Sequence, residues 1–454
     1  MARPFYDRLD WTVVIGTVLL ATISLLTLYS VSSSGGGETS IVFRQASWFA
    51  LGFLLIVIVT SIDYHILCAL AYPLYGLLVL ALSVVLVFGE TVKGAQRWIK
   101  FGPISLQPSE LAKIALILVL AKYFSDRKKD TVYFTDLVIS GILLGIPVAL
   151  IIKEPDLGMS VLLFPIFAAI VFVAGIDVKP VVRILMFRPL FITLIIAILV
   201  SSFYRIQLKE YWTLSEQSFT QLKREGIPTD ILDRLGKLQD EEYTVEKKFV
   251  SDVRECIGKE QTPLYQPLLL RHAKPKLRLI SVPFMWMWLH LEKYQRNRLL
   301  AFIRPASDPL GSGYHIRQSQ IAIGSGGFWG KGYMNGTQSQ LKFLPEQFTD
   351  FVFSVFSEEW GFVGSAVLLF IYLILALKGL AIASKAKDKL GRLIAVGVVT
   401  ILVVHMFVNV GVTTGIMPVT GLTLPLMSYG GSSIFSTSIA LGLLLNVSYR
   451  RFDF

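Results

Sequence analysis

Basic side chains recur in two short stretches that separate apolar segments of the chain. Arg97 and Lys100 lie in the first stretch, and Lys153 lies in the second, where Asp156 follows three residues later. Lysine and arginine bind phosphate and carboxylate groups through charge-assisted hydrogen bonds. The two stretches therefore indicate a site for an anionic ligand, with contact to anionic lipid head groups as the alternative.

Glu110 and Lys113 form a second candidate site at the start of an apolar segment. Residues three apart share one face of a helix, so the two charges can pair there. An ionisable residue inside a membrane-spanning helix is costly and is a functional hypothesis by default. The alternative is a purely structural ion pair.

Asp350 is a third candidate, because it ends a polar segment directly before another apolar run. A carboxylate in such a place can act as a general base. The alternative is structural, since Thr and Asp are both favoured at the N-cap of a helix. Glu358 and Glu359 follow about two turns into the same run, where acidic side chains are again costly. Considered alone, Asp350 favours the helix cap.

Two other kinds of site are disfavoured by their spacing. The glycine-rich segment Gly324–Lys331 resembles a phosphate-binding loop, but Ser325 occupies its first glycine position and Gly332 stands where Ser or Thr must bind magnesium. The five histidines show no metal-ligand spacing, and we expect His405 to be a hydrogen-bond partner between helices. The two cysteines lie in different segments, which argues against a disulfide framework or a cysteine metal site.

The composition places these candidates in a membrane. Of 454 residues, 54% are apolar and 17% are charged, and the mean hydropathy is +0.61. Soluble domains have about 25% charged residues, and many apolar runs here reach the roughly 20 residues that cross a bilayer as a helix. The runs are continuous, which excludes the alternating strands of a membrane barrel. The net charge of +11 then reports topology and contact with membrane lipids, so no nucleic-acid partner is expected.

We therefore expect an all-α polytopic membrane protein with about ten transmembrane helices. With the N-terminus inside, the inner segments carry 16 Lys and Arg residues and the short outer loops carry four. Because positive residues favour the inner side, both termini are expected in the cytoplasm. The first run is long enough to remain a span and not be cleaved as a signal peptide. The predicted spans are 11–31, 41–61, 67–88, 109–121, 136–152, 158–174, 189–204, 354–377, 393–411 and 429–448.

A large extracytoplasmic segment is predicted between spans seven and eight, in two parts. Residues 205–278 carry 26 charges in 74 residues and two apolar stripes at helical spacing, which is typical of a small helical insert. Docking of a partner on this insert is the alternative. Residues 279–353 are apolar, aromatic and rich in Gly and Pro, and long loops of this kind are usually functional. The predicted helical parts are 1–204, with an outer loop at 89–109, and 354–454.

The chain resembles the SEDS family (shape, elongation, division and sporulation) across its whole membrane part. Arg-Trp-Ile at 97–99 with Gln107–Glu110 is similar to the family's first outer-loop signature, and Lys153–Gly158 is similar to its second. The departure is the insert 205–278, which is not typical of the family. The remaining matches, in the family's order, are Tyr294–Arg296, Asp308–Tyr314, Gln318–Ser319, Ala322–Gly327, Gly336–Glu359, Leu424–Pro425 and Ser428–Ser433.

The resemblance implies a peptidoglycan glycosyltransferase in the bacterial cell (inner) membrane, with its active site on the extracytoplasmic face. Such an enzyme polymerises lipid II, an undecaprenyl-diphosphate-linked precursor, together with a class B penicillin-binding protein. Asp350 matches the family's essential acidic residue, and Glu110 and Lys113 match its buried charged pair. Gly336–Leu341 favours the branch that determines rod shape over the division branch.

The chemistry of that reaction suits these residues. The substrate presents a diphosphate anion beside an apolar tail, so the site needs cations at head-group level and an apolar groove into the bilayer. Diphosphate leaves without a proton, so one carboxylate, Asp350, is sufficient as general base. No cofactor is evident, although a divalent cation, Mg or Mn, could share the work, and no spacing identifies its ligands. The predicted substrate-binding residues are Arg97, Lys100, Glu110, Lys113, Lys153 and Asp156.

Two other functions remain open. A transporter (flippase) that moves the lipid-linked precursor would also need intramembrane charges and an apolar groove. Against it, the best carboxylate and the densest motif lie in an outer loop, and no inverted repeat is visible in the sequence. The third hypothesis is a non-catalytic scaffold for cell-wall enzymes.

Overall fold

The computed structural model describes residues 9–33, 40–92, 95–101, 104–127, 132–175, 211–213, 235, 274–276, 312–341, 343–344 and 346–451. The chain divides into two compact units. The first consists of Met1–Val178 and Glu292–Phe454, and the second of Lys179–Leu291. Each unit is described by itself.

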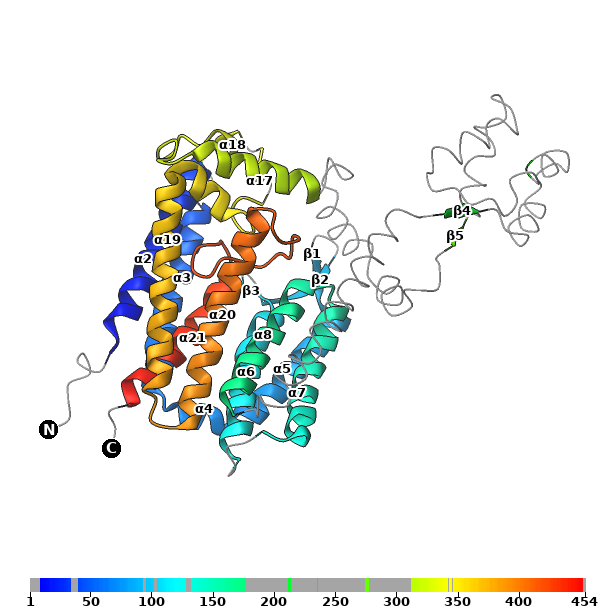
Figure 1. Cartoon of the computed structure of the whole chain (residues 1–454), viewed down its shortest axis with the longest axis vertical. Helices are drawn as coiled ribbons and strands as arrows, with labels where there is room; N and C mark the ends of the chain where they lie inside the picture. The colour runs from blue at the N-terminus through cyan, green and yellow to red at the C-terminus, as the bar shows by residue number, and fades with distance from the viewer. Residues whose placement is uncertain are drawn as a thin grey trace, which may run out of the picture. The chain divides into compact units, whose positions relative to one another are not determined.

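The first unit is a bundle of α-helices (Figure 1). Seven of the helices in the described ranges (α2, α3, α5, α7, α19, α20 and α21) are long and apolar enough to cross a membrane, and α8 is a shorter apolar helix. The predicted class, a helical polytopic membrane protein, is confirmed. The helices are α2 (Trp11–Ser33), α3 (Ser40–Ser61), α4 (Tyr64–Ala69), α5 (Ala71–Phe88), α6 (Pro108–Ser125), α7 (Phe134–Lys153), α8 (Leu157–Val173), α17 (Ser312–Gly326), α18 (Thr337–Gln340), α19 (Val352–Ser384), α20 (Lys389–Thr413) and α21 (Gly431–Arg450).

Nine of the ten predicted spans fall on helices of this unit. The exception, 189–204, lies outside the described residues, so the count of ten spans remains a prediction. The fourth predicted span falls on α6, which carries Glu110, Lys113 and Lys122 and is not among the seven long apolar helices. Span three is shorter than expected, since the short helix α4 ends at Ala69 and α5 begins separately at Ala71.

Helices α6 and α20 pack at the centre of the unit. The buried residues of α6 number 14 out of 18, and those of α20 number 16 out of 25. A helix that is buried on nearly every side belongs to the interior of a larger protein. The two helices approach closely where Gly397 of α20 meets Ile117 of α6, because a Cβ atom at this glycine would lie 2.7 Å from the isoleucine side chain. This packing brings the polar residues of both helices inside the bundle.

The predicted outer loop 89–109 contains a small antiparallel sheet. Its strands are β1 (Glu90–Val92), β2 (Ala95–Phe101) and β3 (Ile104–Leu106), in the order β1-β2-β3. Ile99 pairs with Leu106, and Lys100 pairs with Ser105. This sheet was not predicted, because strands this short give too weak an alternation to recognise in a sequence, yet their pairing satisfies main-chain groups that would otherwise lack partners. The sheet gives Arg97 a fixed place.

Helix α19 is interrupted at Gly361, and the glycine-rich segment after α17 fills the interruption. Gly361 has a φ of +63°, which favours glycine. The amides of Lys331 and Gly332 donate to the carbonyls of Glu358 and Glu359, and the amides of Phe362 and Val363 donate to Gly327 and Phe328. The segment rejected above as a phosphate loop therefore has a packing role.

The carboxylate of Glu358 also connects α19 to the segment that follows α17. It is fully buried and accepts hydrogen bonds from the amides of Gln338 and Ser339, at 2.9 and 3.2 Å, and from Lys331 Nζ at 2.7 Å. The expected irregular loop 279–353 thus contains the helices α17 and α18 in its described part. Both contact the N-terminal part of α19.

The second unit is described at β4 (Tyr211–Thr213), β5 (Lys274–Lys276) and Leu235. The two strands are antiparallel, and Thr213 pairs with Lys274. Leu235, from one of the predicted apolar stripes, is helical and buried. The other residues of the predicted stripes lie outside the described residues.

Candidate functional site

A buried ion pair lies between α6, α20 and α21. Lys113 Nζ is 2.6 Å from Glu110 Oε2, and Ser436 Oγ of α21 donates to the same carboxylate oxygen at 2.9 Å. The two charged side chains are only 1% and 6% exposed. Removing one partner of such a pair typically costs about 3–5 kcal/mol, because the other charge remains buried alone. The predicted pairing of these residues is present.

His405 of α20 completes this cluster. Its Nε2 lies 3.1 Å from Lys113 Nζ, and its Nδ1 lies 3.0 Å from the carbonyl oxygen of Thr423. A carbonyl can only accept and an ammonium group can only donate, so His405 carries its proton on Nδ1 and accepts at Nε2. The expected role of His405 as a hydrogen-bond partner between helices is confirmed.

A second cluster surrounds Asp156 at the turn between α7 and α8. Asp156 Oδ1 accepts from the amide of Met159 and so caps α8, and Oδ2 accepts from Gln107 Nε2 at 3.0 Å. Arg97 Nη1 of β2 lies 3.5 Å from the same Oδ2. Arg97 also donates from Nε and Nη2 to the carbonyls of Glu154 and Pro155, at 3.2 and 2.7 Å. Two of the predicted outer-face residues, Arg97 and Asp156, therefore lie together.

Glu154 lies in the same turn and is a residue that the sequence reasoning missed. Its side chain is fully buried, and neither carboxyl oxygen has a hydrogen-bond partner. Burial, together with the charge of Asp156, raises the pKa of Glu154 to about 8, and the opposing effect of Arg97 is smaller.

Asp350 lies in the turn that leads into α19, where it is partly buried. The main-chain carbonyls of this turn are all held: Phe348 accepts from the amide of Tyr429 at 2.8 Å, Thr349 from Ser428 Oγ at 2.6 Å, and Asp350 from Asn409 Nδ2 at 3.0 Å. The turn is thus attached to α20 and to the loop before α21. Its backbone is fixed.

The structural alternative for Asp350 was a helix N-cap, and this interpretation was wrong. Phe351 occupies the N-cap position of α19, and no side chain caps the helix there. The carbonyl of Asp350, rather than its carboxylate, makes the bond to Asn409. The carboxylate is therefore not committed to capping.

One face of α20 joins the parts of the site. His405 and Asn409 are four residues apart and share that face, separated by about 6 Å along the helix axis. His405 holds Lys113 and Thr423, and Asn409 holds Asp350 and the carbonyl of Leu422. The buried pair and the Asp350 turn are thus attached to successive turns of one helix. Neither Asn409 nor this role was predicted, although a polar residue in an apolar span was an available signal.

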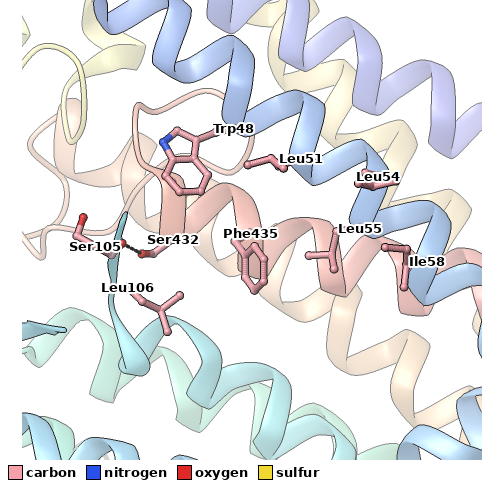
Figure 2. A pocket seen from close by; sticks show the side chains of 10 residues that line it. Trp48, Leu51, Leu54, Leu55, Ile58, Ser105, Leu106, Ser432 and Phe435 are labelled. Atoms are coloured by element: carbon pink, nitrogen blue, oxygen red, sulfur yellow. Dashed lines mark hydrogen bonds between the residues drawn. The ribbon is translucent and has the colours of Figure 1, made fainter. Parts of the chain in front are cut away.

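An apolar groove opens beside these clusters, with a volume of about 350 Å³ (Figure 2). At one end of it, Ser432 Oγ donates to the carbonyl of Ser105 and accepts from the amide of Gln107. Gln107 in turn binds Asp156. Ser432 in the groove is therefore linked through Gln107 to the cluster that contains Arg97. The lining of the groove includes Trp48, Leu51, Leu55 and Ile58 of α3, Leu106 of β3 and Phe435 of α21.

The other predicted cations lie at the edges of this arrangement. Lys153 ends α7 and is exposed. Lys100 lies on β2, and its side chain falls outside the described residues. Within the described ranges, no three His, Cys, Asp or Glu side chains are grouped so as to hold a metal ion. The expectation of a divalent cation stays a prediction.

The chain is similar to proteins named for cell-wall synthesis. Peptidoglycan glycosyltransferase RodA of Treponema pallidum (strain Nichols) is 36% identical over 448 residues, covering 97% of this chain and 98% of the relative. Peptidoglycan glycosyltransferase MrdB of Escherichia coli (strain K12) is 31% identical over 451 residues, covering 99% and 96%.

Solved structures and a family model agree with these relatives. A chain from a peptidoglycan synthase complex that coordinates polymerisation and crosslinking has a TM-score of 0.66 at 28% identity, covering 98% of this chain and 99% of that one. The rod shape determining protein RodA of Thermus thermophilus has a TM-score of 0.58 at 26% identity, covering 98% of both chains. The model of the FtsW, RodA and SpoVE cell cycle proteins matches residues 8–221 and 269–452, and its gap falls inside the insert 205–278. The predicted SEDS membership is confirmed: the chain belongs to the family of cell cycle proteins that includes FtsW, RodA and SpoVE.

Proposed function

We propose that this chain is a peptidoglycan glycosyltransferase that polymerises lipid II into glycan strands for cell elongation and rod shape. One observation carries the proposal: α20 holds the Asp350 turn through Asn409 and the buried Glu110–Lys113 pair through His405, on successive turns. A carboxylate with a fixed backbone is thereby attached to the same helix that contacts the buried ammonium group of Lys113. The names of the relatives support the same reaction.

Asp350 is the proposed general base. A sugar hydroxyl attacks the anomeric carbon of a second lipid-linked sugar, its proton passes to the carboxylate of Asp350, and the bond to diphosphate breaks. Diphosphate leaves as an anion, so the second carboxyl group that hydrolases use as an acid is not needed. A positioned base contributes about 10²- to 10⁴-fold. Phe351 and not Asp350 occupies the N-cap position of α19, so this role does not compete with capping of that helix.

Cations are proposed to stabilise the departing diphosphate. Arg97 is partly exposed beside Asp156, and Lys153 is exposed at the end of α7. Fixed positive groups near a developing negative charge stabilise the transition state without reorganising. Lys113 lies deeper, paired with Glu110, and we assign to it a contribution to the positive potential of the site.

The apolar groove is the proposed site for the lipid tail of the substrate. Its walls are almost entirely apolar side chains of α3, α21 and β3. Its polar end reaches the Arg97–Asp156 cluster through Ser432 and Gln107. A molecule with an anionic head and a long apolar tail would fit an apolar groove next to a cluster that contains a cation. A lipid-linked diphosphate has that form.

The proposed setting is the bacterial inner membrane, with the site on the extracytoplasmic face. The chain of similar structure in a peptidoglycan synthase complex supports a class B penicillin-binding protein as partner. Such a partner would crosslink the strands that this chain makes. The surrounding lipids are the other expected contacts.

Purified full-length protein with its partner and fluorescent lipid II tests the proposal. Formation of glycan polymer is the expected result. Movement of the fluorophore across vesicles without polymer would instead identify a transporter. Absence of both glycan polymer and fluorophore movement, in protein that binds its partner, would identify a scaffold.

A further inference from the structure

Glu154 is a buried carboxyl group to which the proposed reaction gives no role. It directly follows the last residue of α7, it is 0% exposed, and neither carboxyl oxygen has a hydrogen-bond partner. Burying an unpaired carboxylate costs far more than burying the neutral acid. The surroundings of Glu154 therefore favour its protonated form.

Arg97 lies next to Glu154 but is not directed at its carboxyl group. Its Nε and Nη2 donate to the main-chain carbonyls of Glu154 and Pro155, and Nη1 approaches Asp156. The guanidinium thus spans the turn along its backbone and faces Asp156. In this position the Glu154 carboxyl has a cation nearby without pairing with it.

The charges around Glu154 come from several elements. Asp156, on the same turn, opposes a second negative charge, while Arg97 of β2 favours it. Lys153 at the end of α7 is exposed, and Glu110 and Lys113 of α6 pair with each other. The loop that packs against the start of α8 meets it through uncharged Thr420 and Leu422. The side chain of Lys100, also on β2, lies outside the described residues.

We propose that Glu154 is a positioning residue for Arg97: the neutral acid leaves the guanidinium beside Asp156 for the substrate diphosphate, and the ionised form draws it away. Arginine–carboxylate pairs are strong and often bidentate, so an ionised Glu154 would compete for the guanidinium. Arg97 already contacts the backbone of Glu154, so a side-chain rotation is sufficient. This inference rests on the proposed function.

The consequence is a loss of substrate affinity on the alkaline side. Because Glu154 ionises around pH 8, the fraction of protein in the binding-competent form falls above that pH. The apparent KM rises as that fraction falls, by roughly tenfold one pH unit above the pKa. The kcat should change little, because saturating substrate restores the competent arrangement. The Glu154→Gln variant keeps a neutral side chain of the same shape at every pH.

The test measures lipid II polymerisation by the full chain with its partner, across about one pH unit on each side of 8. We expect KM to rise roughly tenfold in the wild type and to stay within about twofold in Glu154→Gln. A matched control is Asp126→Asn, which removes an exposed carboxylate after α6, beyond the last turn of that helix. It should retain the wild-type profile.

A second readout does not require activity. The pKa of Glu154 is raised from 4.5 to about 8 in the folded protein, so the folded state holds the proton more tightly than the unfolded state. Stability therefore falls as pH rises from 4.5 to 8, and then levels off. This fall should be absent in Glu154→Gln. The Tm of the variant should therefore rise relative to that of the wild type between pH 4.5 and 8.

Two results would overturn the inference while leaving the proposed function intact. One is an unchanged alkaline rise of KM in Glu154→Gln. The other is a high KM of that variant at all pH values, which would show that the carboxylate itself is needed. Absence of polymer from the wild type at every pH, in protein that binds its partner, would overturn both proposals.

Discussion

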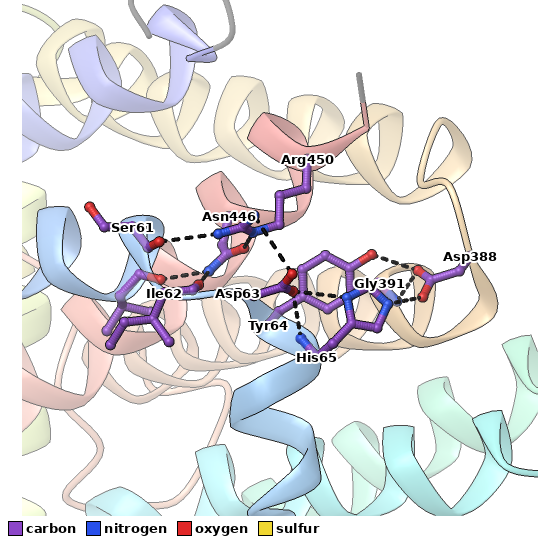
Figure 3. A network of polar contacts seen from close by, with 10 residues as sticks. Ser61, Ile62, Asp63, Tyr64, His65, Asp388, Gly391, Asn446 and Arg450 are labelled. Carbon is purple, nitrogen blue, oxygen red and sulfur yellow. Dashed lines mark hydrogen bonds and ion pairs between the residues drawn. The ribbon is translucent and has the colours of Figure 1, made fainter. Parts of the chain in front are cut away.

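Both ends of the helical bundle hold acidic and basic side chains in contact, but their surroundings differ. At the end where α4 meets the turn between α19 and α20, His65 lies 2.8 Å from Asp63 and 2.9 Å from Asp388 (Figure 3). The His65 side chain is 54% exposed. At the other end, the Glu110–Lys113 pair is almost fully buried.

Burial, rather than the number of ion pairs, distinguishes the two ends. Exposed pairs contribute about 0–1 kcal/mol each to stability. The network around His65 connects α4 to α20 and α21 through Asp388 and Arg450. A buried pair is costly, and apolar residues of similar size would often serve stability as well. The buried charges of α6 contact His405 of α20, the helix that also holds the Asp350 turn, and their presence therefore points to chemistry at that end.

The largest effect is expected from breaking the buried pair. Lys113→Met leaves Glu110 buried without a partner and should lower the free energy of unfolding by about 3–5 kcal/mol. Lys122→Met is the matched control on the same helix, because its ammonium lies 2.9 Å from the carboxylate of Asp126 and the two side chains are 30% and 53% exposed. It should cost at most about 1 kcal/mol. Thermal unfolding in detergent measures both.

The double variant Glu110→Gln, Lys113→Met sharpens this comparison. It should regain most of the lost stability, because no charge is left unpaired. Polymerisation should remain low if the ammonium contributes to the potential at the diphosphate. Recovery of both stability and activity would show that the pair is purely structural.

A smaller effect on stability is expected at the exposed end, where the contribution of the Asp63 carboxylate depends on pH. Although burial acts to raise the pKa of Asp63, hydrogen bonds from His65 and the charge of Arg450 together lower it below 3.8. A lowered pKa adds stability at neutral pH, and this is lost as the pH falls through the folded-state value. Because Asp63 is about one-third exposed, Asp63→Asn should lower stability by less than about 1 kcal/mol.

Thermal unfolding of the wild type and of Asp63→Asn at several pH values tests this prediction. Tm values of the wild type and Asp63→Asn should differ slightly at neutral pH and converge as the pH falls below 3.8. A difference that persists unchanged in acid would show that the carboxylate charge is not its source.

The smallest effect on activity is expected from removing the insert. Thr213 of β4 pairs with Lys274 of β5, so the chain enters and leaves this segment at neighbouring points. Replacing residues 214–273 with a short Gly/Ser linker should keep polymerisation within a few-fold, since the described site residues all lie in the other unit. Complete loss of activity in folded protein would show that the insert shapes the site.

The sequence predicted those parts of the molecule that repeat a strong local pattern. Apolar runs located nine helices of the described bundle, and the spacing of Glu110 and Lys113 predicted their pairing. The interruption at Gly361 was not predictable, because it depends on a segment about 30 residues away that supplies the missing main-chain hydrogen bonds.

The site was predicted as separate groups, and the contacts that join them were not. In the sequence, Asn409 is a single polar residue in an apolar span. Its hydrogen bonds to the carbonyls of Asp350 and Leu422 arise only from the packing of the folded chain. Glu154 was overlooked between Lys153 and Asp156, since its burial depends on how α7, α8 and β2 meet. Long-range contacts of this kind leave no periodic signal in a sequence.

The most direct test of the account replaces Asp350 with asparagine in the full chain and measures lipid II polymerisation with the partner present. Asn preserves the size of the side chain and the main-chain bond to Asn409, and α19 has no side-chain cap to lose. We therefore predict normal thermal stability and partner binding, with polymerisation reduced by about 10²- to 10⁴-fold. Robust strand synthesis by Asp350→Asn would contradict the assignment of Asp350 as general base and would direct attention to Glu110 and Asp156.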